Sequence, residues 1–190
     1  VAIALLRQMK SDVQVLALSA TIRNAEEVAD WLKAEYVTTE WRPVELREGV
    51  CLNNTITFKN GALKQLKKLH QRDDLNIALN SVVEGGQALI FVESRLRAMS
   101  SAREAASALD GYLAKRVQTE LQKISADILV HGEKTRLSDD LSSFASMGAA
   151  FHHAGLRTEH RRIIEDAFKA GKIKILVATP TLAAGVNLPA

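Results

Sequence analysis

The residues closest to doing chemistry follow a strongly apolar run near the C-terminal end. Residues 173–178 read IKILVA, which has the β-branched content of a buried parallel strand. Thr179-Pro180-Thr181 break this run, because proline offers no ladder hydrogen bond and two threonine hydroxyls lie beside freed backbone amides. A small residue such as Gly185 lets a phosphate approach the backbone. Ligands sit at this end of strands in open α/β sheets, so the stretch predicts either an anion-binding loop or an ordinary turn and short helix.

The adjacent histidines His152 and His153 raise the question of a metal site. Neighbouring side chains on an extended chain point to opposite sides, and His70, His131 and His160 show no ligand spacing with the pair. We therefore predict that the protein holds no metal here.

A second polar stretch follows the apolar residues 13–18. Ser19-Ala20-Thr21 place two hydroxyls directly after this predicted strand, where they can exchange hydrogen bonds with neighbouring loops. An ordinary turn explains the same three residues equally well.

Two groups of residues could contact phosphates or serve the helices alone. Ser94 can cap the helix that follows a predicted strand, and Arg95 beside it can contact a phosphate. Arg157, Arg161 and Arg162 cluster at the start of a later helix, where they form either a phosphate clamp or an exposed basic face.

Four stretches in the chain resemble, in order, the motifs of superfamily 2 helicases of the Ski-like branch. They are LSAT at 18–21 (motif III), ALIFVESR at 88–95 (motif IV), FHHAGL at 151–156, and ATPTLAAGVNLPA at 178–190 (motif V). Within this branch the chain is most similar to the archaeal Hjm-type DNA repair helicases, the helicase 308 group.

The resemblance implies roles for individual residues. Motif III implies that Ser19, Ala20 and Thr21 couple the nucleotide state to domain closure. The implied nucleic-acid contacts are Ser94, Arg95, His152, His153, Gly155 and Thr179. Gly185 and Asn187 are implied to reach the nucleotide or the domain interface, although many relatives carry aspartate in place of Asn187. Asparagine keeps the hydrogen bonding and loses the charge.

The activity implied by the resemblance is that of an ATP-dependent 3′ to 5′ DNA helicase, which moves on single-stranded DNA and unwinds forked duplexes in repair. ATP and Mg²⁺ would be its cofactors. The chain contains no glycine-rich phosphate loop with its lysine and no magnesium-binding acidic motif, so we expect it to bind no cofactor and to hydrolyse no ATP alone. Two alternatives stay open: a Ski-like RNA helicase of the exosome or splicing type, and a non-catalytic nucleic-acid-binding module.

The elements that must position these residues alternate between strand and helix. From residue 87 onward this alternation predicts an α/β fold with a parallel sheet flanked by helices, as in the implied RecA-like fold, with a helical insert. We expect residues 1–40 to be the end of a first RecA-like domain and residues 41–190 to be a second one, truncated before motif VI.

The local patterns predict the individual elements. The expected strands are 13–18, 36–39, 44–47, 50–58, 87–92, 149–151 and 173–178, and the expected helices are 1–9, 74–83, 94–109, 112–121, 127–131, 137–147 and ones capped by Asn24 and Thr158. Gly49 is expected in a turn, Asn53-Asn54 are expected to weaken their hairpin, and Ser138 is expected to cap a helix. Residues 63–69 are expected to be a basic helix or a loop.

Composition limits the class of protein. The 190 residues are 47% hydrophobic, which is ample for a core, and the net charge of +3 leans only slightly toward an anionic partner. A single cysteine excludes an intramolecular disulfide, and neither a membrane span nor a signal peptide is evident. We expect a soluble, intracellular (cytoplasmic) monomeric piece of a longer helicase, whose partners are DNA, or alternatively RNA, and the rest of its own chain.

Overall fold

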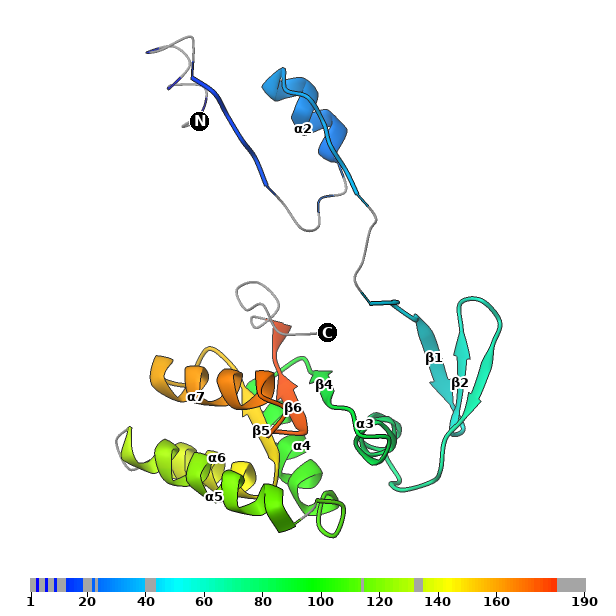
Figure 1. Cartoon of the computed structure of the whole chain (residues 1–190), viewed down its shortest axis with the longest axis vertical. Coiled ribbons are helices and arrows are strands. Elements are labelled where there is room, and N and C mark those ends of the chain that lie inside the picture. The colour runs from blue at the N-terminus through cyan, green and yellow to red at the C-terminus, as the bar shows by residue number, and fades with distance from the viewer. Residues whose placement is uncertain are drawn as a thin grey trace. The chain divides into compact units, whose positions relative to one another are not determined.

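A computed structural model describes residues 3, 6, 9, 13–18, 22, 24–39, 44–113, 115–131 and 135–180 of the chain. The chain divides into two compact units, residues 1–46 and residues 47–190. The larger unit contains a small antiparallel sheet and a separate parallel sheet covered by helices (Figure 1).

The smaller unit contains helix α2, Ala25–Leu32. Ala29 and Leu32 are buried on one side of this helix, and Lys33 ends it in the left-handed conformation with φ of 50°. Asn24 occupies the predicted N-cap position, but its side chain donates to Glu27 Oε2 at 3.2 Å and caps no backbone N–H.

The prediction of strands is wrong for three segments. Residues 13–18, 36–39 and 44–47 do not form strands. Leu18 and Val37 are 85% and 88% exposed, so these segments do not present a packed apolar face. An extended segment becomes a strand only through ladder hydrogen bonds to a partner, and a local apolar pattern does not say whether a partner exists.

The larger unit begins with an antiparallel sheet in the order β1 (Gly49–Leu52), β2 (Thr55–Phe58), β3 (Leu63–Gln65). Asn53 and Asn54 form the two-residue turn between β1 and β2, with φ of 49° and 61°. Two successive positive φ values suit the twist of a tight hairpin, and asparagine tolerates them better than most residues. The asparagines that were expected to weaken the hairpin therefore make its turn.

Two further expectations for this sheet are corrected. Gly49 lies within β1 and not in a turn, and a Cβ atom there would come within 2.9 Å of the Ile56 side chain. Residues 63–69 form β3 and a loop instead of a basic helix, because Leu63 and Lys64 pair with β2.

Helix α3, Asp73–Val83, holds the preceding loop through a fully buried asparagine. Asn76 Oδ1 accepts hydrogen bonds from the backbone N–H groups of Leu69 at 2.7 Å and His70 at 3.1 Å. Its Nδ2 donates to Asn54 Oδ1 at 3.0 Å. One side chain thus ties the hairpin turn and the loop to α3.

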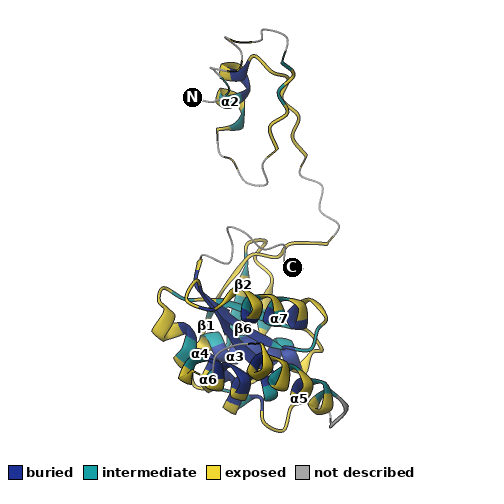
Figure 2. Cartoon of the chain, turned by 90° about the vertical axis from the view of Figure 1, so that its left-hand side faces the viewer, coloured by how far each residue is buried: buried dark blue, intermediate teal, exposed yellow. Residues whose placement is uncertain are grey.

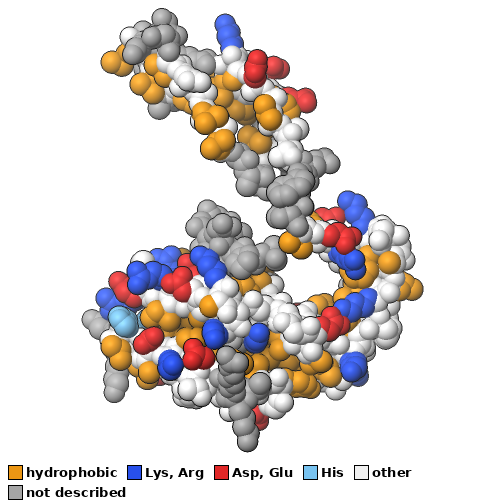
Figure 3. All heavy atoms as spheres, in the orientation of Figure 1, with side chains coloured by type: hydrophobic (Ala, Val, Ile, Leu, Met, Phe, Trp, Pro, Cys, Tyr) orange, Lys and Arg blue, Asp and Glu red, His pale blue; other side chains and the backbone are white. Residues whose placement is uncertain are grey.

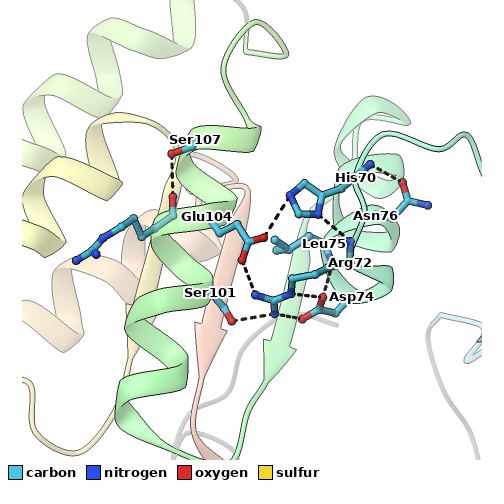
Figure 4. Close-up of polar contacts among 9 residues, drawn as sticks. His70, Arg72, Asp74, Leu75, Asn76, Ser101, Glu104 and Ser107 are labelled. Carbon is cyan, nitrogen blue, oxygen red and sulfur yellow. Dashed lines mark hydrogen bonds and ion pairs between the residues drawn. The ribbon is translucent and has the colours of Figure 1, made fainter.

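Arg72 joins the start of α3 to helix α4, Arg95–Ala108 (Figure 4). Its guanidinium donates to Asp74 at 2.5 and 3.1 Å, to Glu104 at 2.6 Å and to Ser101 at 3.0 Å. Burial acts to raise the pKa of Asp74, but the hydrogen bond and charge of Arg72 outweigh it and hold that pKa below its ordinary value. The cluster fixes α3 against α4.

The parallel sheet has the order β4 (Ala88–Phe91), β6 (Ile175–Ala178), β5 (Ala149–His152). All four residues of the central strand β6 are 0% exposed, which confirms the buried parallel strand predicted there. The strand expected at residues 87–92 is present as β4, which is only partly buried, with Phe91 49% exposed. Among the described strands, β4 and β5 are the outer two, and β5 is fully buried.

Helices cover both faces of the parallel sheet (Figure 1). The chain passes from β4 to β5 and returns to β6 between them, so right-handed crossovers put α4 and α7 (Thr158–Lys169) on opposite faces. Ala98, Ala102 and Ala105 are fully buried on α4, and their small side chains allow the helix to approach the sheet closely. Figure 2 shows the buried residues concentrated in the sheet and on the inner helix faces.

The predicted helical insert is present as a pair of helices, α5 (Lys115–Val130) and α6 (Arg136–Ser146), which pack against each other. The segments expected as separate helices, 112–121 and 127–131, are largely one continuous helix. Thr135, not Ser138, is the N-cap of α6, and the two side chains form a reciprocal capping box. The α/β class with a helix-flanked parallel sheet is confirmed.

Candidate functional site

The carboxyl ends of the three parallel strands meet at one edge of the sheet. Phe91, Ala178 and His152 stand side by side at the ends of β4, β6 and β5. Just beyond them, the backbone N–H of Thr179 donates to the carbonyl oxygen of His152 at 3.1 Å. The carboxyl ends of parallel strands all lie at the same end of the sheet. His152 and Thr179, two predicted site residues 27 positions apart in the sequence, are therefore neighbours there.

His152 is buried, with 4% of its surface exposed, and its ring faces α7. Nε2 lies 2.8 Å from Oε1 of Glu165. Burial lowers the pKa of His152 below its ordinary value, the Glu165 carboxylate opposes this shift, and the positive charge of Arg161 adds to it. The neutral ring carries one N–H, and a carboxylate only accepts, so Nε2–H donates to Glu165 and Nδ1 is left as an acceptor.

His153 is also buried, at 3% exposed, and stacks on Phe151 with ring centroids 5.5 Å apart and planes 14° apart. Burial lowers the pKa of His153, with the positive charge of Arg95 and the neighbouring His152 as smaller causes. Its Nδ1 accepts a hydrogen bond from the Gly155 backbone N–H at 3.1 Å, so the proton of the neutral ring is on Nε2. This Nε2–H is buried without a hydrogen-bond partner among the described residues.

Gly155 contributes by lacking a side chain beside His153 and Arg95. A Cβ atom on Gly155 would come within 3.1 Å of the His153 ring and 3.2 Å of Arg95 Nη1. The exposed guanidinium of Arg95 and the buried imidazole of His153 therefore both lie on the side of Gly155 where a side chain would project. A cation and a ring N–H at the carboxyl edge of a sheet are both donors for an anion.

Ser94 serves as a helix cap. Its Oγ accepts a hydrogen bond from the Arg97 backbone N–H at 3.2 Å and so caps α4, as the sequence predicted. The hydroxyl proton remains able to donate, and the nucleic-acid contact of Ser94 stays a prediction.

The basic cluster at the start of α7 has both inward and outward members. Arg161 is partly buried, donates to Thr158 Oγ1 at 3.2 Å, and keeps a buried Nε without a partner within the described part of the chain. Arg157 and Arg162 are exposed. Basic and acidic side chains alternate over α7 (Figure 3). This mixed charge favours an ordinary exposed face over a phosphate clamp for Arg157 and Arg162.

Comparison with known proteins identifies the domain. Residues 63–190 match the family described as the helicase conserved C-terminal domain. The chain belongs to this helicase family. The RecA-like α/β fold implied by its motifs is thereby confirmed.

Three relatives are each named ATP-dependent DNA helicase Hel308. The chain is 42% identical to the protein from Methanocella arvoryzae over 100% of its own length, 38% identical to that from Methanocaldococcus jannaschii over 96%, and 39% identical to that from Caldivirga maquilingensis over 99%. It spans 25%, 15% and 25% of these relatives, so it corresponds to a quarter of their length or less. These similarities confirm the resemblance to the helicase 308 group.

Five predicted helicase-motif residues lie outside the described residues: Ser19, Ala20, Thr21, Gly185 and Asn187. Their roles stay predictions. Within the described ranges, no three His, Cys, Asp or Glu side chains converge as metal ligands would, and no helix has the length and apolar character needed to cross a membrane.

The site contains one residue that sequence reasoning missed, Glu165. Nothing in the motifs points to it, because it lies on a helix outside all four stretches. The available signal is weak: Arg161 and Glu165 are four positions apart and so share one side of the helix that follows the histidine pair. That spacing does not predict which strand residue the Glu165 carboxylate contacts.

Proposed function

We propose that the chain is part of an ATP-dependent DNA helicase and that the carboxyl edge of its parallel sheet holds the phosphates of single-stranded DNA. The observation that carries this proposal is the convergence of Arg95, His153 and Thr179 from three segments on one edge. Backbone contacts of this kind carry no sequence information, which suits a protein that moves along a strand. Affinity should then fall steeply with salt.

Each residue has a distinct part in the proposed contact. Arg95 is exposed and supplies a mobile positive charge, while Thr179 is 7% exposed and supplies a hydroxyl at the strand end. Because Thr179 is largely covered, the proposal requires its hydroxyl to become accessible when DNA binds. His153 Nε2–H is a buried donor without a partner among the described residues, and a phosphate oxygen would provide that partner once DNA binding makes this atom accessible as well.

We further propose the wider assignment implied by the motifs. Residues 1–40 end one RecA-like domain and residues 41–190 belong to a second, with Gly185 and Asn187 near the nucleotide or the domain interface. The helicase resemblance implies that the intact protein uses ATP and Mg²⁺, and these 190 residues contain no phosphate-binding loop with its lysine to hold them. Movement is 3′ to 5′ on forked DNA, the protein is soluble and cytoplasmic, and the 190-residue piece by itself is monomeric.

Changing Thr179 to alanine in the intact protein is expected to weaken binding of single-stranded DNA about 10- to 100-fold, the range for a lost hydrogen bond to a charged group. Fluorescence anisotropy with a labelled oligonucleotide measures the affinity, and DNA-stimulated ATP hydrolysis should require correspondingly more DNA. Thr179→Ser keeps the hydroxyl and is expected to bind nearly normally. Equal affinities for the alanine variant and the wild type would remove Thr179 from the contact.

Unwinding assays distinguish the helicase from its alternatives. Matched DNA and RNA forked duplexes, each with a 3′ or a 5′ loading strand, are offered to the intact protein with ATP and Mg²⁺. The proposal expects unwinding of DNA from the 3′ tail. Preference for RNA would favour the Ski-like RNA helicase, and no unwinding with retained binding would favour a non-catalytic module.

A further inference from the structure

A partly buried acid–imidazole pair joins the strand that precedes the proposed phosphate contact to the helix that covers it. The side chain of Glu165 is 18% exposed, that of His152 is 4% exposed, and the two meet at 2.8 Å. The pair joins α7 to the end of β5.

Placing the Glu165 carboxylate against His152 costs hydration free energy. A partly buried carboxylate loses hydration that one hydrogen bond replaces only in part, and an apolar side chain would usually fill the same space at lower cost. In return, the acceptor fixes both the orientation of the His152 ring and the location of its proton on Nε2.

The backbone of His152 contacts Thr179 directly. The His152 carbonyl oxygen accepts the hydrogen bond from Thr179 N–H at 3.1 Å, where the chain leaves β6. His152 also pairs with Ala178 in the parallel register. A connected path of Glu165, His152 and Thr179 therefore runs from α7 to the strand-end loop.

We infer that Glu165 is a positioning residue for DNA binding: its carboxylate holds His152, and through the His152 carbonyl it sets the orientation of Thr179 without touching DNA. This inference rests on the proposed function, since it assigns Glu165 a use only if Thr179 contacts the strand. The ligand whose binding Glu165 supports is the same single-stranded DNA backbone.

The test compares variants of the intact protein in DNA-stimulated ATP hydrolysis. Glu165→Ala is expected to raise the DNA concentration for half-maximal stimulation about tenfold, while the rate at saturating DNA stays within about twofold, because the defect lies in holding the strand. Glu165→Gln keeps an oxygen that accepts from His152 Nε2–H and is expected to restore near-normal binding. Asp166→Asn changes the exposed neighbouring charge and serves as the matched control.

Thermal unfolding separates positioning from simple stability. Should Glu165→Ala fail to fold, Glu165→Asp withdraws the carboxylate by one methylene and is expected to give a smaller rise in the same direction. A lowered melting temperature with an unchanged DNA requirement would overturn the inference, as would a fall in the saturated rate alone. If Thr179→Ala weakens binding and Glu165→Ala does not, only the positioning role fails; if Thr179→Ala has no effect, the proposed contact and the positioning role fail together.

Discussion

Replacing Phe151 with alanine is expected to lower the free energy of unfolding of the larger unit by about 3–5 kcal/mol. Phe151 is 0% exposed in β5, meets Phe144 edge to face at 6.0 Å, and stacks on His153 at 5.5 Å. Alanine would leave a cavity between the sheet and α6, because a close-packed core collapses only partly around a lost ring. Urea unfolding followed by circular dichroism measures the change.

An exposed phenylalanine in the same sheet provides the control for this measurement. Phe91 ends β4 and is 49% exposed, so Phe91→Ala is expected to cost less than about 1.5 kcal/mol. Phe151→Ala should also weaken DNA binding under native conditions, since the stacked ring holds His153. Similar losses of stability for the two variants would contradict the assignment of Phe151 to the core.

Replacing Asn76 with alanine is expected to cost about 2–4 kcal/mol of stability. The change leaves the backbone N–H groups of Leu69 and His70 and the side chain of Asn54 without their partner. A fully buried unpaired group costs about 1–3 kcal/mol, and these three partly buried groups each cost less because water can reach them. Hydrogen exchange at Leu69 and His70 should accelerate, because the loop loses its anchor to α3.

The matched control for Asn76 is an exposed asparagine with a single local hydrogen bond. Asn60 Oδ1 accepts from the Ala62 backbone N–H at 3.0 Å in the turn before β3. Asn60→Ala is expected to cost less than about 1 kcal/mol. A loss for Asn76→Ala as small as that of Asn60→Ala would show that solvent satisfies the freed groups.

The sequence predicts the parallel sheet well because buried parallel strands have a distinctive composition. The apolar run before Thr179 must be covered on both faces, and β6 is the fully buried central strand. The local sequence pattern does not predict strand formation or burial where these depend on a neighbouring strand or helix. Residues 13–18 carry the same kind of apolar content and form no strand, while β4 is half-exposed at the edge of the described sheet.

Turn chemistry accounts for the errors in the small antiparallel sheet. Asparagine is uncommon within strands, so Asn53-Asn54 looked like a defect in one long strand. The same residues tolerate positive φ, and the structure uses them as the hairpin turn. Residue type alone did not distinguish an interrupted strand from two strands joined tightly.

The candidate site was predictable in outline and not in its supporting contacts. The nearness of His152 and Thr179 follows from two parallel strands ending at one edge, which motif order and strand patterns already imply. The pairing of His152 with Glu165 depends on how α7 is rotated over the sheet. That rotation is set by packing across the whole core, so no spacing in the sequence reveals it.

The most direct test of the central claim is the salt dependence of single-stranded DNA binding by the intact protein, measured for wild type, Arg95→Gln and Lys169→Gln. Arg95 is exposed at the carboxyl edge beside His153, whereas Lys169 ends α7 after the helix has run back toward the opposite edge. Each phosphate contact on a single strand contributes about 0.7 to the slope of log affinity against log salt concentration. The account predicts that Arg95→Gln lowers the magnitude of this slope by about 0.7 while Lys169→Gln leaves it unchanged. An unchanged slope for Arg95→Gln, or an equal fall for both variants, would contradict a phosphate contact at this edge.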